Sequence, residues 1–329
     1  MKILVTGSLG LVGSEAVKFY TDRGHEVIGI DNNMREFFFG PEGSVVHNQT
    51  THKLFQYFNM DICDCAELFK NNTFDAIIHC AAQPSHDWSA GDPVTDFNIN
   101  AVGTVHLLEN TRMFCPDAVF IYVSTNKVYG DNPNKIKVTE LRNRYESDIY
   151  GIDETMSVDH CIHSAFGVSK LAGDMMAQEY GKNFRIKTGI FRCGCITGAR
   201  HAGAELHGFL AYVAKCKKAK RMYKIYGYKG KQVRDNIHAF DLVNAFDHFI
   251  KKPGYGEVYN MGGGHNCNMS VLEALKVFNV PYEYVDQPRK GDHLWYVSDC
   301  RKFQNKYPEW FYKYSMGDIL DDFISSVRV

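Results

Sequence analysis

The chain has 329 residues, of which 45% are hydrophobic and 23% are charged, an ordinary globular composition whose length suits one large domain with a smaller appended lobe. The formal net charge is -1 at pH 7, so charge gives no reason to expect a nucleic acid or a membrane as partner. No apolar run approaches about 20 residues and an apolar strand follows Met1 directly, so neither a transmembrane helix nor a signal peptide is expected.

Short apolar runs alternate along the chain with segments of helical period. This alternation predicts an α/β fold built on a doubly wound parallel sheet. Gly24 follows the first helix at the position where helices commonly stop. The predicted strands are residues 2–6, 26–30, 74–80, 119–123 and 187–191, and the predicted helices are residues 11–23, 102–112 and 165–180.

The pattern changes after Arg192, where strands become shorter and Gly, Lys and aromatic residues become dense. We interpret this part as a second lobe that covers the first. Residues 237–250 and 258–262 again have the pattern of the main sheet and its helices. The predicted large domain is therefore 1–191 with 232–262. The predicted smaller C-terminal, substrate-binding lobe is 192–231 with 263–329. Residues 32–53 show no clear period and are predicted to be a long loop with a lid or binding role.

The turn after the first strand reads TGSLGLVG from Thr6 to Gly13 and opens the first helix. Its glycines permit a tight turn in which backbone N–H groups approach a pyrophosphate at the helix N-terminus. Asp31 follows the second strand and can accept hydrogen bonds from both adenosine ribose hydroxyls, which favours NAD over NADP, although Arg35 would weaken that preference. The alternative is a structural glycine turn without a ligand. The pattern therefore predicts a Rossmann domain whose NAD contacts are Gly7, Leu9, Gly10, Leu11, Val12, Gly13, Asp31 and Asn32.

Further motifs resemble those of the extended short-chain dehydrogenase/reductases, the nucleotide-sugar epimerases and dehydratases. The resemblance extends along nearly the whole chain, and its specificity comes from the combination of segments. These segments are Asp61-Ile62, Ala81-Ala82-Gln83, NINAVGT at 98–104, STNKVYG at 124–130, GVSK at 167–170, QVRD at 232–235 and RKGD at 289–292.

The resemblance implies roles for individual residues. Catalytic residues would be Asn100, Thr125 and Lys170, with Thr125 bonding to the reacting oxygen. The residues that join the glycine turn in binding NAD would be Asp61, Ile62, Ala81, Ala82, Gln83 and Lys170. The residues that bind a nucleotide-diphosphate sugar would be Ser85, Thr125, Asn126, Lys127, Arg234 and Arg289, with the two arginines on the diphosphate. As an alternative, the arginines would be surface ion-pair partners, for instance of Asp235 or Asp292.

One catalytic position departs from the family. Relatives have a Tyr four residues before the Lys, which takes the hydroxyl proton as the sugar is oxidised, whereas this chain has Phe166. Either Phe166 is an engineered substitution that holds substrate without turnover, or the chain is a natural branch with another base or a held water. His163, one helical turn before Phe166, is the nearest titratable substitute, and Tyr145 and Tyr150 lie in the preceding loop. A structural role is the simpler interpretation for all three.

The subgroup that the chain resembles most is the CDP-tyvelose (CDP-paratose) 2-epimerases, through residues 124–131, His163-Ser164 and residues 230–235. Asn126 and Lys127 replace the acidic residues of the family's 4,6-dehydratases, which disfavours a dehydratase. We therefore expect an NAD-dependent epimerase acting at C2 of a CDP-linked hexose through a transient keto-sugar. The alternatives are a dehydrogenase or 4-epimerase of a UDP-, GDP- or dTDP-sugar, and a redox-silent NAD- or nucleotide-binding module, including one that binds RNA.

Two further expectations concern the state of the protein. The helices at 102–112 and 165–180 resemble those of the family's dimer interface, so a homodimer or larger homo-oligomer is expected. The ten cysteines are scattered without a CxxC pair, which favours reduced thiols in the cytoplasm and predicts no metal site.

Overall fold

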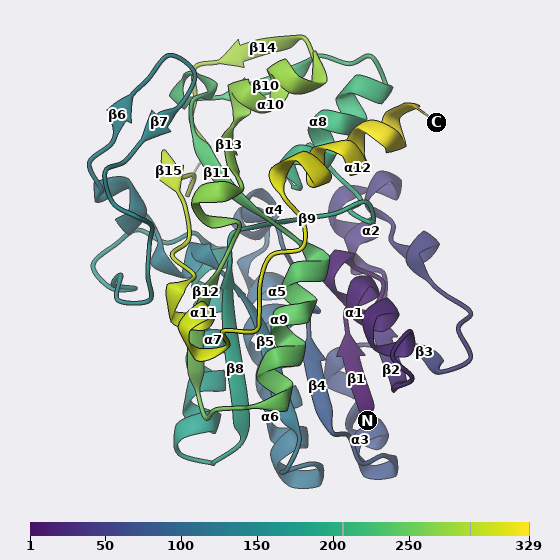
Figure 1. Cartoon of the computed structure of the whole chain (residues 1–329). Coiled ribbons are helices and arrows are strands. Elements are labelled where there is room, and N and C mark those ends of the chain that lie inside the picture. The colour runs from purple at the N-terminus through teal and green to yellow at the C-terminus, as the bar shows by residue number, and fades with distance from the viewer. Residues whose placement is uncertain (206, 290, 329) are drawn as a thin grey trace.

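The computed structural model describes residues 1–205, 207–289 and 291–328 and is built around a seven-stranded parallel sheet (Figure 1). The strand order is β12-β8-β5-β4-β1-β2-β3, so the chain runs outward from β1 in one direction through β2 and in the other through β4. Such a reversal opens a crevice at the carboxyl ends of the strands, where ligands bind in open α/β sheets. The strands are β1 (Lys2–Thr6), β2 (Glu26–Asp31), β3 (Phe55–Asn59), β4 (Ala76–His79), β5 (Val119–Thr125), β8 (Lys187–Cys193) and β12 (Glu257–Met261).

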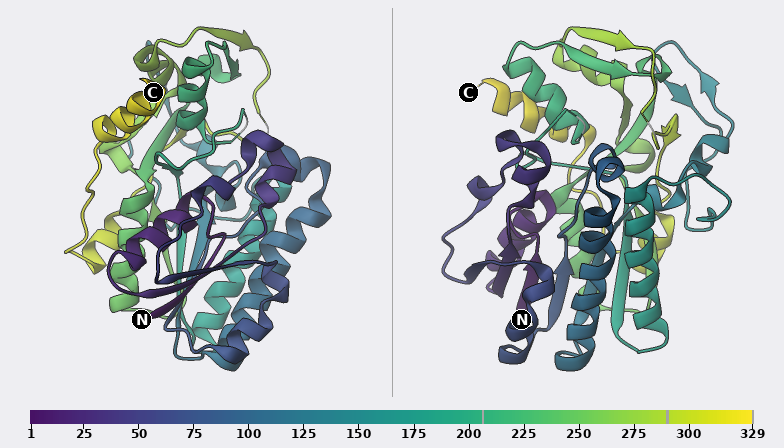
Figure 2. Two further views of the ribbon diagram at one scale, coloured as in Figure 1. Left: turned by 90° about the vertical axis from the view of Figure 1, so that its right-hand side faces the viewer. Right: turned by 180° about the vertical axis from the view of Figure 1, so that it is seen from behind.

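The central strands are apolar on both faces because helices cover both. Ile3, Leu4 and Val5 of β1 are fully buried. On one face, α1 (Leu11–Thr21) packs with α9 (Ala239–Lys251), and on the other face lie α3 (Ala66–Asn71), α6 (Gly103–Phe114) and α7 (Ala165–Lys182) (Figure 2). The predicted fold class, a doubly wound Rossmann sheet with a smaller C-terminal lobe, is confirmed.

The second lobe lies beyond the carboxyl ends of the sheet, at the top of Figure 1. Strands β13, β11 and β15 form a small sheet in which β9 also pairs with β11, and β10 pairs with β14. Three helices, α8 (Phe209–Lys218), α10 (Val271–Phe278) and α12 (Met316–Arg328), close a separate apolar core around Val213 and Ile319. The strands of this lobe are β9 (Cys195–Thr197), β10 (Tyr223–Tyr226), β11 (Val233–His238), β13 (Asn268–Ser270), β14 (Tyr282–Val285) and β15 (Trp295–Tyr296).

The remaining helices and strands are short. They are α2 (Met34–Phe39), α4 (His86–Gly91), α5 (Pro93–Phe97), α11 (Arg301–Lys306) and the strand pair β6 (Thr139–Glu140) and β7 (Tyr145–Glu146). The prediction of an unstructured loop at 32–53 was wrong in part, because α2 and two 3-10 turns lie there. Phe38 of α2 packs on Trp88, with ring centroids 4.6 Å apart, and six residues are too few for a helical period to show in sequence.

Residues 233–261, which lead from the second lobe back to the first, contribute strands to both sheets. β11 pairs with the small sheet, whereas α9 and β12 belong to the large one. The predicted domain boundaries at 191, 232 and 262 therefore stay a prediction. Within the described ranges, no helix has the length and apolar character that crossing a bilayer requires.

Candidate active site

A cavity of about 410 Å³ lies between the carboxyl ends of the sheet and the second lobe. Residues from both lobes line it, including Met34, Arg35 and Phe38 of the segment predicted as a lid. Most of the residues that sequence analysis assigned to NAD, catalysis or substrate meet at this cavity. These are Gly7, Gly10, Leu11, Val12, Gly13, Asp31, Asn32, Asp61, Ile62, Ala81, Ala82, Thr125, Asn126, Lys127, Phe166, Lys170, Arg234 and Arg289.

The glycine turn packs so closely that side chains are excluded from it. Gly7 has φ +65°, and a Cβ on Gly13 would lie 2.0 Å from the Gly7 carbonyl oxygen. Gly10 caps α1 without a side-chain hydrogen bond, and the first turn of the helix carries no acidic residue. The open N–H groups of this helix end therefore fit a pyrophosphate, as the NAD interpretation requires.

Asp31 is fixed at the end of β2 by two backbone donors. Leu9 N–H donates to Oδ2 at 3.0 Å and Asn33 N–H donates to Oδ1 at 2.8 Å. Burial raises the pKa of Asp31 above its ordinary value, while these N–H groups lower it. Leu9 does not line the cavity, so its contribution is to hold the carboxylate that does. Arg35 is bound elsewhere, with Nη2 donating to the Ala202 carbonyl at 2.6 Å.

Thr125 ends β5, and Lys170 comes from α7 beside it. Lys170 Nζ donates to the Val123 carbonyl at 2.7 Å and lies 4.3 Å from the centroid of the Tyr122 ring. Burial lowers the pKa of Lys170 to about 8. Thr125 Oγ1 accepts from Lys127 N–H at 3.3 Å, so the strand end turns sharply there and leaves the hydroxyl at the cavity wall.

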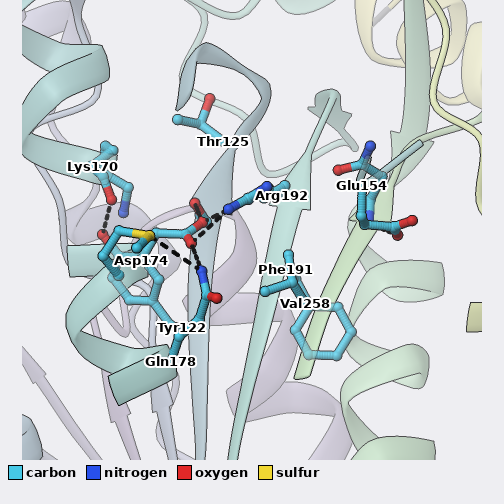
Figure 3. A network of polar contacts seen from close by, with 12 residues as sticks. Tyr122, Thr125, Glu154, Lys170, Asp174, Gln178, Phe191, Arg192 and Val258 are labelled. Atoms are coloured by element: carbon cyan, nitrogen blue, oxygen red, sulfur yellow. Dashed lines mark hydrogen bonds and ion pairs between the residues drawn. The ribbon is translucent and has the colours of Figure 1, made fainter. Parts of the chain in front are cut away.

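A buried network that sequence analysis did not identify fixes α7 against the sheet (Figure 3). Arg192 of β8 reaches Asp174 of α7 through Nε and Nη2, at 2.9 and 3.0 Å. Ser124 Oγ donates to the same carboxylate at 2.7 Å. Because Asp174 lies one turn after Lys170, this network also fixes the position of the lysine.

Phe166 lies one turn before Lys170 and is 7% exposed. Its ring packs against His86 of α4, with centroids 5.0 Å apart and ring planes at 62°. His86 also lines the cavity. Sequence analysis did not name His86, although it directly follows Ser85, which the family resemblance assigned to substrate binding.

Asn100, Gln83 and Ser85 are buried behind the cavity wall and do not line it. Asn100 Oδ1 accepts from Gln83 N–H at 2.9 Å, and its Nδ2 lies 3.0 Å from Ser169 Oγ of α7. Gln83 Oε1 accepts from Ser85 N–H at 2.5 Å. The side chains of Asn100 and Gln83 therefore order the segment after β4, and Asn100 ties it to α7.

The three candidate replacement bases named from sequence lie away from the cavity. His163 Nε2 is 2.9 Å from the Val158 carbonyl and 3.2 Å from Cys161 Sγ, so its ring faces its own loop. Tyr150 packs on His265, with centroids 4.8 Å apart, and Tyr145 belongs to β7. None of the three lines the cavity.

Arg234 and Arg289 of the second lobe and Lys127, which follows β5, form a cluster of cations at the same cavity. Arg234 donates to Asp292 and to the His293 carbonyl, Arg289 Nη2 lies 2.7 Å from Asp87 Oδ2, and Lys127 Nζ donates to the Gly291 carbonyl at 2.9 Å. Burial lowers the pKa of Lys127 to about 8. Burial alone would raise the pKa of Asp292, yet Arg234, Lys127 and Arg289 bring it to about 2. The three cations of this cluster face two carboxylates, which leaves a positive excess suited to a diphosphate.

Nothing among the described residues suggests a metal centre: no three His, Cys, Asp or Glu side chains are grouped so as to hold an ion. All ten cysteines are free.

Comparison with known proteins places this α/β fold and dinucleotide site among characterised relatives. Residues 3–262 match the model of the NAD dependent epimerase/dehydratase family. A CDP-paratose 2-epimerase of Salmonella typhi is 31% identical, with 97% of this chain and 96% of that protein covered. The dTDP-glucose 4,6-dehydratase 1 of Escherichia coli is 27% identical over 93% of this chain and 84% of its own.

Solved structures show the same fold. A UDP-glucose 4-epimerase of Thermotoga maritima with UDP-glucose superposes with a TM-score of 0.82 at 24% identity, covering 100% of this chain and 99% of that one. A UDP-glucose 4-epimerase of Thermus thermophilus in complex with NAD gives 0.79 at 24% identity, with the same coverage. The chain belongs to the NAD-dependent epimerase/dehydratase family, and its cofactor is NAD.

Proposed function

We propose that the chain is an NAD-dependent epimerase of a nucleotide-diphosphate sugar, and specifically of C2 in a CDP-linked hexose, acting through a transient keto-sugar. The observation that carries the proposal is that one cavity is lined by the glycine turn with Asp31, by Thr125 and Lys170, and by the cation cluster. The residues that we propose for the dinucleotide and for the diphosphate thus line one cavity. That arrangement suits a reaction in which the sugar is oxidised and reduced in place.

Each part of the cavity has a task that its chemistry explains. The N–H groups of the glycine turn would hold the pyrophosphate of NAD, and Asp31 would accept from the adenosine ribose hydroxyls. Lys170 would bind the nicotinamide ribose. Arg234 and Arg289 would hold the substrate diphosphate, since a guanidinium donates to two phosphate oxygens at once.

When bound, NAD would supply reversible acceptance of a hydride from the carbinol carbon of the sugar. Thr125 Oγ1 would donate to the sugar oxygen that becomes the ketone, where negative charge develops. Lys127 would neutralise phosphate charge nearby. Return of the hydride to the other face of the ketone would complete the inversion, leaving the cofactor unchanged.

One observation favours a CDP-linked hexose and C2, and a second disfavours a dehydratase. The relative that is 31% identical over nearly the whole chain is a CDP-paratose 2-epimerase. Asn126, at the cavity wall, cannot act as a general acid, so the water elimination of a 4,6-dehydratase lacks its proton donor at this position.

The test is a panel of CDP-, UDP-, GDP- and dTDP-hexoses incubated with the protein in D2O and followed by NMR, for the chain as it stands and for Phe166→Tyr. The expected product is the 2-epimer of a CDP-sugar that retains its carbon-bound hydrogen, because a returned hydride does not exchange with solvent. Solvent deuterium at the epimerised carbon, or conversion of no nucleotide sugar by either protein, would overturn the proposal. A 4-epimer or a product from another nucleotide would establish the alternative instead.

We further propose that the protein is a homodimer or larger homo-oligomer through the face formed by α6 and α7. The two helices lie side by side on one face, which is turned to the viewer in the right panel of Figure 2. Large apolar side chains on or next to them are exposed, among them Val102, Met113, Val168, Met175 and Phe184. Large exposed apolar side chains on two adjacent helices are a reason to propose an association site there.

A further inference from the structure

His86 is a polar side chain in the cavity that the proposed mechanism does not yet use. It is the first residue of α4, after the N-cap Ser85. Its ring lies against Phe166, and a Cβ added to Gly291 would come within 3.3 Å of Nδ1, so the loop after β14 covers it from the other side. Both ring nitrogens are buried, and neither has a hydrogen-bond partner among the described residues.

Two unpaired nitrogens on one buried ring are costly, and so they point to a polar ligand as their partner. The sugar of the bound substrate is that ligand if the proposed function holds, because the cavity also contains Thr125 and the cation cluster. We propose that His86 is a catalytic residue of the epimerase, whose imidazole accepts the proton of the reacting sugar hydroxyl in place of the phenol that Phe166 lacks. The inference rests on the proposed function.

The proton and electron changes balance over the cycle. The O–H bond breaks toward an imidazole nitrogen, which becomes imidazolium, while the carbinol C–H bond breaks toward NAD and a C=O bond forms. In the second half the hydride returns to the opposite face, and the imidazolium gives its proton back to the oxygen. The sugar is inverted and His86 is again neutral.

Other groups of the cavity are less suited to the task. Lys127 Nζ donates to the Gly291 carbonyl, and with a pKa of about 8 it is mostly a cation at neutral pH, which cannot accept a proton. Thr125 is a donor to the developing oxyanion but a poor base. Burial, together with Lys127 and Arg289, lowers the pKa of His86 to about 3, so its imidazole is neutral and free to accept.

The charges around His86 also explain how a bound substrate would raise the pKa of its imidazole. Lys127 and Arg289 lower its proton affinity, and Asp292 raises it. A diphosphate bound to the cation cluster would offset Lys127 and Arg289. The pKa of His86 should then rise toward a value at which the imidazole shares a proton with the sugar oxygen.

The experiment compares wild type with His86→Gln, which keeps a hydrogen-bonding amide but has no basic nitrogen. We expect kcat to fall by about 10²- to 10⁴-fold while the affinity for CDP, measured by calorimetry, changes by less than about threefold. Adding Phe166→Tyr to His86→Gln should restore part of kcat, because a phenol then replaces the lost base. A merely structural role of His86 would not be rescued in this way. His265→Gln, at an exposed position that does not line the cavity, is the matched control.

A second measurement does not depend on turnover. In protein labelled with ¹⁵N-histidine, the His86 signal is assigned by its absence in His86→Gln, and CDP is the probe. Without CDP we expect the ring to stay neutral down to about pH 5. With CDP we expect its pKa, followed down to about pH 4, to rise by about one unit or more. A His86 pKa that does not respond to CDP would overturn the proposal.

The kinetic outcomes separate the two proposals. If wild type converts a nucleotide sugar and His86→Gln is equally fast, or if His163→Gln is the slow variant, His86 is not the base and the proposed function stands. If Phe166→Tyr converts a nucleotide sugar and wild type does not, the His86 assignment fails but the proposed function stands. If neither protein converts any nucleotide sugar, the proposed function fails.

Discussion

Asp174 on α7 and Arg192 on β8 form a buried two-point ion pair, with Arg192 Nε 2.9 Å and Nη2 3.0 Å from the two carboxylate oxygens. Their side chains are 0% and 6% exposed. The pair holds the helix that carries Lys170 against the strand layer beneath the cavity. Asp174 and Arg192 do not line the cavity, yet they determine where Lys170, for which we propose a role in binding the nicotinamide ribose, stands.

Replacing this carboxylate should destabilise the whole domain. We expect Asp174→Asn to lower the free energy of unfolding by about 3–5 kcal/mol, because the Arg192 cation would stay buried without a compensating charge. Urea unfolding measures the change. Asp22→Asn, which breaks the exposed ion pair with Lys18, is the control and should cost less than about 1 kcal/mol. Equal losses of unfolding free energy in Asp174→Asn and Asp22→Asn would contradict the importance of the buried ion pair.

Gly13→Ala should abolish tight NAD binding. The new Cβ would lie 2.0 Å from the Gly7 carbonyl oxygen, so the turn must open and its N–H groups must leave their positions. We expect at least a tenfold loss of affinity, or about 1.4 kcal/mol, by calorimetry. Gly91→Ala is the matched control, because a Cβ there meets nothing within 4 Å. NAD affinity unchanged in Gly13→Ala would place the dinucleotide elsewhere.

Asp31→Ala should weaken NAD binding and reduce discrimination against NADP. The carboxylate would lose its hydrogen bonds to the ribose and no longer repel a 2′-phosphate, so a 10- to 100-fold loss for NAD, roughly 1.5–3 kcal/mol, is expected. Asp117→Ala, at an exposed position, should leave NAD affinity unchanged. Because Asp31 also accepts hydrogen bonds from the Leu9 and Asn33 N–H groups, the free energy of unfolding of the variant is measured as well. A variant that unfolds normally and binds NAD as wild type does would refute the role.

The dinucleotide half of the site could be predicted from sequence because its determinants are local. A strand, a glycine turn and a helix follow one another within residues 2–21, and Asp31 ends the next strand. The substrate half depends on how the second lobe folds over the sheet. Arg234 and Arg289 lie far apart in the chain and reach one cavity only through β11 and the loop after β14.

His163 is close to Phe166 in sequence, but its ring does not line the cavity. His163 was placed one helical turn before Phe166, but α7 begins at Ala165 with Ser164 as its N-cap. His163 therefore stands outside the helix and turns toward Val158. His86 lies far from Phe166 in sequence, yet its ring contacts Phe166 because α4 packs on α7. Helix boundaries and long-range packing, which decide between these two residues, are what a single sequence encodes least directly.

CDP affinity should fall as pH rises through about 8. Burial lowers the pKa of Lys127 to about 8, so the side chain is a cation below that pH and loses its charge above it. The anionic diphosphate attracts the cationic form, so binding is strongest below the pKa and weakens by up to about tenfold for each pH unit above it. Lys127→Met should bind CDP more weakly, with a smaller pH dependence between about pH 7 and 9. The same slope in wild type and variant would assign the titration to another group, such as Lys170.

The oligomer proposal predicts that a charge on α7 separates the subunits. Met175 is 51% exposed on the α6–α7 face, and a carboxylate there would be buried without a partner in the dimer. Sedimentation velocity should therefore show wild type as a dimer or larger and Met175→Glu as a monomer. Met222→Glu, with a methionine that is 54% exposed in the second lobe, is the matched control and should stay assembled. If Met222→Glu dissociates and Met175→Glu does not, the subunits meet through the second lobe, and the apolar residues of α6 and α7 serve another partner.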